Sequence, residues 1–153
     1  LEKQADETDA DRQLTAIGTQ NATRMGMNLK KKDIVLDILI SSPAARAQAT
    51  TELLAEQIGY DLSRIHFNAE IYNASIRTLL KVVNNLKNEW GNVLLIGHNP
   101  AISYLAEYVS GEPIGNMDTC GLVKLSFNID GWEEVSEKNG EFISYEYPDL
   151  LNF

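Results

Sequence analysis

An arginine and a histidine, each just after an apolar run, have side chains suited to binding phosphate. The first run ends in Ser41, Ser42 and Pro43, which predicts a helix with Ser42 as its N-cap and Pro43 at its first position. Arg46 lies one turn into that helix, and helical side chains lean toward the N-terminus, so its guanidinium should reach that end. The donor fork and permanent charge of arginine suit a phosphoryl group. The alternative for Arg46 alone is a surface arginine with a solvated head group.

The histidine, His98, directly follows the apolar residues 94–96. In open α/β sheets, ligands bind beyond the carboxyl ends of the strands, which is where His98 should lie. Gly97 has no side chain and allows close approach, while Asn99 and Pro100 are expected to cap and start another helix. His98 is therefore a candidate phosphate donor or general base. The alternative is a histidine that only caps the end of the strand.

The elements that must position these two residues follow from hydrophobic periodicity. Residues 1–12 are polar and acidic and predict an exposed loop. Helices are expected from Thr15 to about Lys32, from the Ser-Pro cap to Gly59, from Ser75 toward Gly91, and after Pro100. Strands are expected at 34–40, 64–69 and 93–96, followed by an alternating antiparallel pair at 122–129 and 141–147. This order predicts one domain over residues 1–153, an α/β/α sandwich of three layers with a mostly parallel central sheet and antiparallel C-terminal edge strands.

Composition excludes several classes of protein. The net charge is −9 over 153 residues, which disfavours binding to nucleic acid or anionic membranes. A single cysteine, Cys120, rules out an intramolecular disulfide and favours a reducing compartment such as the cytoplasm. With only two histidines besides that cysteine, a structural zinc site is not expected. The sequence shows neither a run of about 20 apolar residues nor a signal peptide.

Four motifs, in order along the chain, resemble the SixA-type phosphohistidine phosphatases of the histidine phosphatase superfamily. They are RQLTAIG at 12–18, SSPAARAQAT at 41–50, GHNP at 97–100, and the closing segment with Thr119-Cys120-Gly121 and Trp132. The resemblance spans nearly the whole chain. It implies the phosphoglycerate mutase-like fold and a phosphatase that needs no metal or other cofactor and forms a phosphohistidine intermediate.

The resemblance also implies roles for particular residues. Arg46 matches the second arginine of the family's phosphate pocket and His98 its second histidine, so both are expected to bind phosphate and act in catalysis. The family's nucleophile is the histidine of an Arg-His pair at the end of its first strand, and no such pair occurs here. We expect that pair and its strand to precede Leu1. His66 lies in the wrong segment and is predicted to be a surface residue.

Two further residues, Glu70 and Cys120, have side chains that could take part in catalysis. Glu70, at the end of the predicted strand 64–69, is the candidate acid for the leaving group, and its alternative is a carboxylate facing solvent. Cys120 is expected to be structural, because no basic residue adjoins it in the sequence to lower its pKa.

The leading hypothesis is a cytoplasmic signalling phosphatase that hydrolyses phosphohistidine on a protein, as in a phosphorelay. Its partner is then a phosphorylated protein, and neither nucleic acid nor a membrane. One alternative is a phosphomonoesterase of the same superfamily that acts on a small phosphate ester. The other is a scaffolding protein that binds phosphate without turnover. The sequence does not determine the oligomeric state.

Overall fold

Three short parallel strands form the centre of the molecule in the computed structural model, which describes residues 8–151. They are β1 (Ile38–Ser41), β2 (His66–Phe67) and β3 (Val93–Ile96), in the order β2-β1-β3. Ile40 aligns with His66 on one side and with Leu95 on the other. All four residues of β1 are buried. The central strand is therefore buried on both faces, as expected of a strand covered by two layers.

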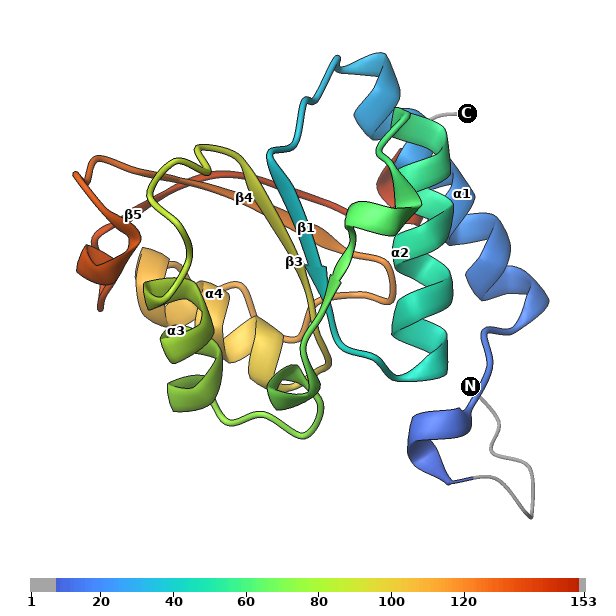
Figure 1. Ribbon diagram of the computed structural model, residues 1–153, viewed down its shortest axis with the longest axis horizontal. Coiled ribbons are helices and arrows are strands. Elements are labelled where there is room, and N and C mark those ends of the chain that lie inside the picture. Colours follow the sequence, from blue (N-terminus) through green and yellow to red (C-terminus); the bar gives the residue numbers. More distant parts are fainter. Residues whose placement is uncertain (1–7, 152–153) are drawn as a thin grey trace.

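Helices cover both faces of this sheet. The long helices α1 (Ala16–Lys31) and α2 (Ala45–Ile58) lie side by side on one face, and α3 (Ile76–Asn84) and α4 (Ala101–Ser110) cover the other (Figure 1). A Cβ atom at Gly26 of α1 would lie 2.8 Å from Cβ of Gln57, so α1 packs very close to α2 at this point. The predicted α/β/α arrangement of three layers is confirmed.

The predicted helix ends are set by short polar contacts. Thr15 Oγ1 accepts a hydrogen bond from the Gly18 amide at 3.0 Å and caps α1. Ser75 Oγ accepts one from the Thr78 amide at 3.2 Å and caps α3. Gly59 ends α2 in the left-handed conformation with φ 73°. These three caps confirm the sequence signals used to place them. The stop predicted for α3 at Gly91 is wrong, because the helix ends at Asn84.

Two predicted strands are shorter than expected. The segment 34–40 becomes a strand only from Ile38, because the Asp37 carboxylate accepts hydrogen bonds from the Gly91 and Asn92 amides and fixes a turn. In segment 64–69, only His66–Phe67 pairs as β2. The preceding residues form the 3-10 turn η2 (Leu62–Arg64), and Ala69 begins η3 (Ala69–Ile71).

The C-terminal strands form a sheet of their own. β4 (Leu122–Phe127) and β5 (Gly140–Glu146) pair antiparallel, with an irregularity between Lys124 and Leu125. Within residues 8–151, β4 makes no ladder with β3, so the expectation of edge strands on the central sheet is corrected. The 3-10 turns η4 (Trp132–Glu134) and η5 (Pro148–Leu150) flank β5.

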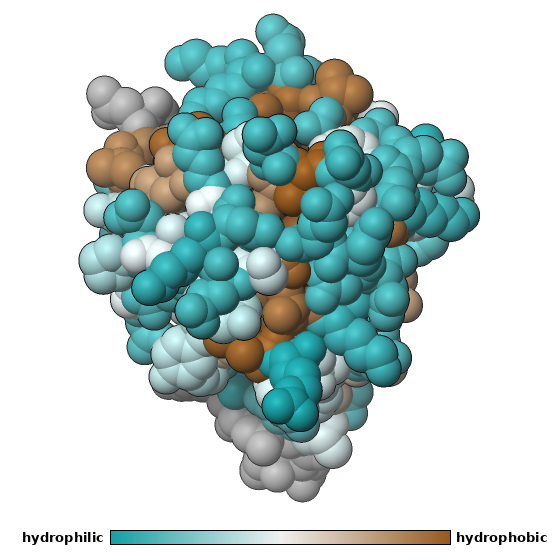
Figure 2. Space-filling view, turned by 90° about the vertical axis from the view of Figure 1, so that its left-hand side faces the viewer, coloured by the Kyte–Doolittle hydropathy of each residue, from teal (hydrophilic) through white to brown (hydrophobic). Residues whose placement is uncertain are grey.

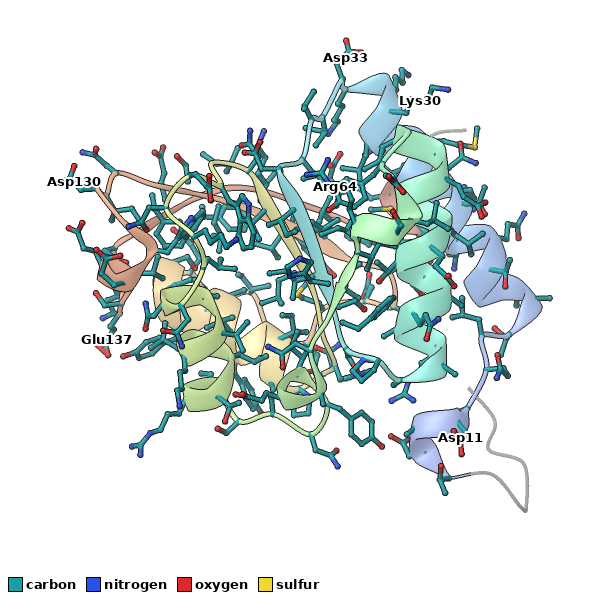
Figure 3. All side chains as sticks on the ribbon, in the orientation of Figure 1. Asp11, Lys30, Asp33, Arg64, Asp130 and Glu137 are labelled. Atoms are coloured by element: carbon teal, nitrogen blue, oxygen red, sulfur yellow. The ribbon has the colours of Figure 1, made fainter. Side chains whose placement is uncertain are left out.

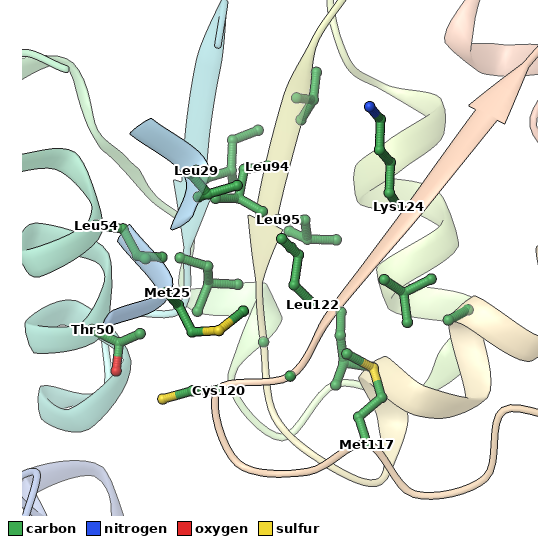
Figure 4. Close-up of a pocket in the computed structure, with 18 of the residues that line it drawn as sticks. Met25, Leu29, Thr50, Leu54, Leu94, Leu95, Met117, Cys120, Leu122 and Lys124 are labelled. Atoms are coloured by element: carbon green, nitrogen blue, oxygen red, sulfur yellow. The ribbon is translucent and has the colours of Figure 1, made fainter. Parts of the chain in front are cut away.

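An apolar slot separates these two sheets. We call it the β3–β4 slot, and it has a volume of about 1420 Å³. Its lining comes from helices on both faces of the central sheet and from β3 and β4, with Met25, Leu54, Leu94, Leu95 and Leu122 among the side chains around it (Figure 4). Arg46 and His98 also border the slot.

One face of the molecule is mainly polar. The face seen in Figure 2 is mostly hydrophilic, with a narrow strip of apolar side chains running down its middle. No helix within residues 8–151 is long and apolar enough to cross a membrane.

Candidate active site

Ser42 follows the end of β1, but it does not cap α2 as the sequence suggested. The helix begins at Ala45, and its N-cap residue, Ala44, makes no capping bond through a side chain. Ser42 Oγ instead accepts a hydrogen bond from the Ala44 amide at 3.2 Å and lies 2.7 Å from His98 Nε2. Pro43 precedes the helix rather than opening it.

His98 follows the end of β3, where a short turn leads into α4. Pro100 occupies the N-cap position of that helix, after a cis Asn99–Pro100 peptide bond, and is not its first helical residue as expected. The Asn99 amide donates to the Met117 carbonyl at 2.9 Å. A Cβ atom at Gly97 would meet its nearest neighbours at an ordinary 3.4 Å, so the described residues do not require glycine there.

The side chains of Arg46 and His98 converge, although 52 positions separate them in the sequence. Arg46 Nη2 lies 3.5 Å from His98 Nδ1. The Arg46 side chain is 20% exposed and His98 is half-buried, and both border the β3–β4 slot. The two strand–helix junctions therefore open onto one rim, at the carboxyl ends of β1 and β3.

Asp9 is a third member of this cluster, and no motif in the sequence pointed to it. Its carbonyl accepts from Arg46 Nη1 at 2.8 Å, and its carboxylate lies 3.3 Å from Arg46 Nη2 and 3.2 Å from Arg12 Nη1. Tyr72 donates its hydroxyl hydrogen to the same carboxylate at 2.6 Å. Asp9 begins the turn η1 (Asp9–Asp11), and Figure 3 shows Asp11 beside the start of α2.

The expected exposed loop at 1–12 is therefore corrected where the structure describes it. Residues 9–11 form a 3-10 turn tied to Arg46, while residues 1–7 lie outside the described part. The sequence gives only a weak signal for this contact with Arg46. Thr8 and Asp9 look like any polar pair before a helix, and Arg46, the partner of Asp9, lies 37 residues away.

These contacts shift the ionisation of the cluster. The hydrogen bond from Tyr72, helped by Arg46, lowers the pKa of Asp9 to about 2 from 3.8. The same hydrogen bond raises the pKa of Tyr72. Burial, followed by the positive charge of Arg46, lowers the pKa of His98 below 6.5, while Asp9 opposes that change. At neutral pH the free site thus holds an anionic Asp9 and a neutral His98.

Tyr72 also contacts the histidine ring, and no sequence signal pointed to it. The two rings meet edge to face with their centroids 5.6 Å apart. Tyr72 follows η3, so this turn brings a phenol to the rim from a third segment of the chain.

The other candidates lie apart from this cluster. Glu70 is exposed and borders a separate hollow with His66 and Trp90, and no contact is found between Glu70 and either Arg46 or His98 in the described residues. Its role as an acid stays a prediction. His66 is exposed and packs edge to face on Trp90, as expected of a surface residue. Burial raises the pKa of Cys120, which agrees with a structural role.

Metal ligands and the expected nucleophile are the remaining features of the predicted site. Among residues 8–151, no group of three or more His, Cys, Asp or Glu side chains is arranged to hold a metal ion. The expected Arg-His pair would precede Leu1, so it lies outside the described residues and stays a prediction.

Comparison with known proteins finds a match between part of this chain and one superfamily. Residues 2–72 match the family described as the histidine phosphatase superfamily (branch 1). An uncharacterised protein of Mycobacterium leprae is 23% identical over 150 residues, which cover 92% of this chain and 89% of the relative.

Solved structures share the fold of this chain. The structure of the protein histidine phosphatase SixA complexed with tungstate is 24% identical, with a TM-score of 0.83 over 97% of this chain and 93% of the other. A structure from Agrobacterium tumefaciens, described as a SixA phosphohistidine phosphatase, is 26% identical, with a TM-score of 0.81 over 97% of this chain and 91% of the other. The phosphoglycerate mutase-like fold is thereby confirmed.

Proposed function

We propose that this chain is a member of the histidine phosphatase superfamily, which its residues 2–72 match and whose fold it shares, and that it hydrolyses phosphohistidine on a protein. The observation that carries the proposal is the convergence of Arg46 Nη2 and His98 Nδ1, 3.5 Å apart, from two separate strand–helix junctions. A guanidinium and an imidazole at this spacing can contact different oxygens of one phosphoryl group. Their task is to stabilise the charge of the group in transfer.

The proposed reaction has two steps. A nucleophilic histidine attacks phosphorus, a new N–P bond forms, and the bond to the leaving imidazole of the substrate breaks. The leaving imidazole takes a proton from solvent. Water then attacks phosphorus, the N–P bond of the intermediate breaks, and inorganic phosphate is released as the nucleophilic histidine is regenerated. Arg46 and His98 hold the phosphoryl oxygens through both steps, and no metal or other cofactor takes part. Glu70 remains the candidate acid for ester substrates, whose alkoxide leaving groups need a proton more than imidazole does.

We propose that the nucleophile belongs to a strand lying in the β3–β4 slot, supplied by polypeptide upstream of Leu1. The support is the slot itself, which is lined by apolar side chains of both sheets and reaches Arg46 and His98. Among residues 8–151, β3 pairs only with β1 and β4 only with β5, so each strand has one edge without a ladder. Such edges accept an added strand.

Amide hydrogen exchange tests the added strand. The 153-residue chain of 17.1 kDa is compared with the protein extended upstream to its first codon. We expect the edge amides of β3 and β4 to exchange rapidly in the shorter chain and to be protected in the longer one. Equal exchange in both, or a folded monomer of 17.1 kDa with full activity, contradicts the proposal.

A turnover assay on the extended protein tests the function. The substrates are a histidine-phosphorylated protein and p-nitrophenyl phosphate, and the variants are Arg46→Ala and His98→Ala. Faster hydrolysis of the phosphoprotein, lost in both variants, supports the proposal. Preference for the small ester favours the phosphomonoesterase, and phosphate binding without turnover favours the scaffold. Equal turnover by wild type and both variants removes Arg46 and His98 from the mechanism.

The partner and location follow from the same proposal. A protein substrate in a phosphorelay would make this a signalling phosphatase of the cytoplasm, in keeping with its single cysteine. The net charge of −9 favours a partner protein with a basic surface and disfavours nucleic acid and anionic membranes.

A further inference from the structure

Ser42 is held rigidly against the imidazole of His98. Its backbone amide donates to the Ile96 carbonyl at 3.1 Å, which ties the end of β1 to the end of β3. Its Oγ accepts from the Ala44 amide at 3.2 Å and lies 2.7 Å from His98 Nε2. Because Ser42 is 0% exposed, water does not compete for these contacts. The serine is thus a fixed partner for one ring nitrogen.

The other ring nitrogen faces a group that can only donate. Arg46 Nη2 lies 3.5 Å from His98 Nδ1, and a guanidinium has no acceptor. A proton on Nδ1 would set two N–H groups against each other, so the neutral ring should carry its proton on Nε2 and donate it to Ser42 Oγ. The charged groups around the ring are Arg46 from α2 and Asp9 from η1, and the Tyr72 phenol faces it after η3. Burial and Arg46 keep the ring neutral at pH 7.

Resting on the proposed function, we propose that Ser42 is a positioning residue that holds the Nε2–H of His98 and aims Nδ1 at the phosphoryl group. When a phosphoryl dianion binds beside Arg46, its negative charge favours protonation of His98. The new proton, taken from solvent, resides on Nδ1, and this N–H group donates a hydrogen bond to a phosphoryl oxygen. The Nε2–H bond to Ser42 stays the same in both states, so the ring does not turn as the ligand arrives.

A nucleophilic role for Ser42 is the competing explanation, because a serine beside a histidine is also the arrangement of an activated nucleophile. Burial argues against it. With 0% exposure, Ser42 Oγ has no open path to a phosphorus atom. Its oxygen is also occupied by the Ala44 amide and by the imidazole. The hydroxyl therefore orients the ring and does not attack the substrate.

Nitrogen NMR of the ¹⁵N-histidine-labelled extended protein tests this directly, because the spectrum distinguishes a protonated from an unprotonated ring nitrogen. His98→Gln assigns the signals of His98, and the exposed His66 serves as an internal reference. We expect His98 at neutral pH to show one tautomer, with Nδ1 unprotonated, and His66 to show the averaged mixture of a solvated ring. A His98 signal with Nδ1 protonated in the free protein overturns the proposal.

Two serine variants separate the role of Ser42 from general disruption. Ser42→Ala should give His98 a mixture of tautomers. Ser41→Ala is the matched control, since Ser41 is equally buried and its hydroxyl donates to the Ser42 carbonyl at 2.8 Å without touching the ring. Unchanged His98 signals in folded Ser42→Ala overturn the proposal. If Ser42→Ala does not fold, the tautomer of His98 in the wild-type protein still supports or overturns the proposal.

Adding inorganic phosphate and measuring turnover complete the test. Phosphate should raise the pKa of His98 and place the new proton on Nδ1, whereas an unchanged titration contradicts the proposal. Ser42→Ala should lower kcat/KM by about 2- to 12-fold, the effect of one neutral hydrogen bond. The tautomer measurement needs no turnover, so an inactive protein with the expected tautomer refutes the proposed function and leaves the role of Ser42 intact.

Discussion

Arg46→Lys is a stringent test of the site, because it keeps the positive charge of the side chain and removes the paired donors of the guanidinium. In the free protein, Arg46 uses Nη1 to contact the Asp9 carbonyl at 2.8 Å and Nη2 to contact the carboxylate at 3.3 Å. A phosphoryl group can take both donors, whereas an ammonium reaches one oxygen as a point charge. The variant therefore loses one charge-assisted hydrogen bond in the transition state.

The expected magnitude follows from that one bond. A hydrogen bond to a charged group contributes about 1.5–3 kcal/mol, which is a factor of about 10 to 150 in kcat/KM. Arg46→Ala removes the whole group and should cost at least about 100-fold. It should also raise the pKa of His98, because the charge of Arg46 lowers that pKa in the wild type.

The assay is steady-state hydrolysis of the phosphoprotein by the extended protein, with the His98 titration followed by NMR. Arg77→Lys is the matched control, since Arg77 is exposed on α3. Activity of Arg46→Lys within twofold of both the wild type and Arg77→Lys would refute the reasoning that the fork binds the phosphoryl group.

Three further predictions concern stability. Gly140→Ala should lower the free energy of unfolding by about 1–3 kcal/mol, measured with denaturant, because its Cβ would lie 2.7 Å from the Phe127 ring. Gly97→Ala should be tolerated, because the nearest atoms to its Cβ would lie 3.4 Å away. Equal losses of stability in the two variants contradict this prediction. Asp9→Asn tests the lowered pKa, since the stabilisation from Asp9 should be complete above about pH 4 and lost as the pH falls toward 2. The difference between wild type and Asp9→Asn must narrow over that range, and a constant difference refutes it. Thr15→Ala should lose about 1 kcal/mol with the cap of α1, unlike the exposed Thr19→Ala.

Several features could be predicted from the sequence alone, because they depend on interactions between residues close together in the chain. The caps at Thr15 and Ser75 and the stop at Gly59 depend on residues within a few positions, and they are found where expected. The apolar run ending at Ser41 predicted a strand buried on both faces. Two such strand ends, one before Arg46 and one before His98, predicted a common rim, because parallel strands end at the same edge of a sheet.

Tertiary structure decided what the side chains at that rim touch. Ser42 is a good N-cap by type, yet its hydroxyl binds His98, since the end of β3 lies beside it in space. Asp9 and Tyr72 join the site through contacts across 37 and 63 positions, and no pattern of neighbouring residues encodes them. Likewise the separation of β4 from β3 depends on strand pairing. Sequence periodicity reports which face of an element is apolar, whereas partners distant in the chain are chosen only when the whole fold closes.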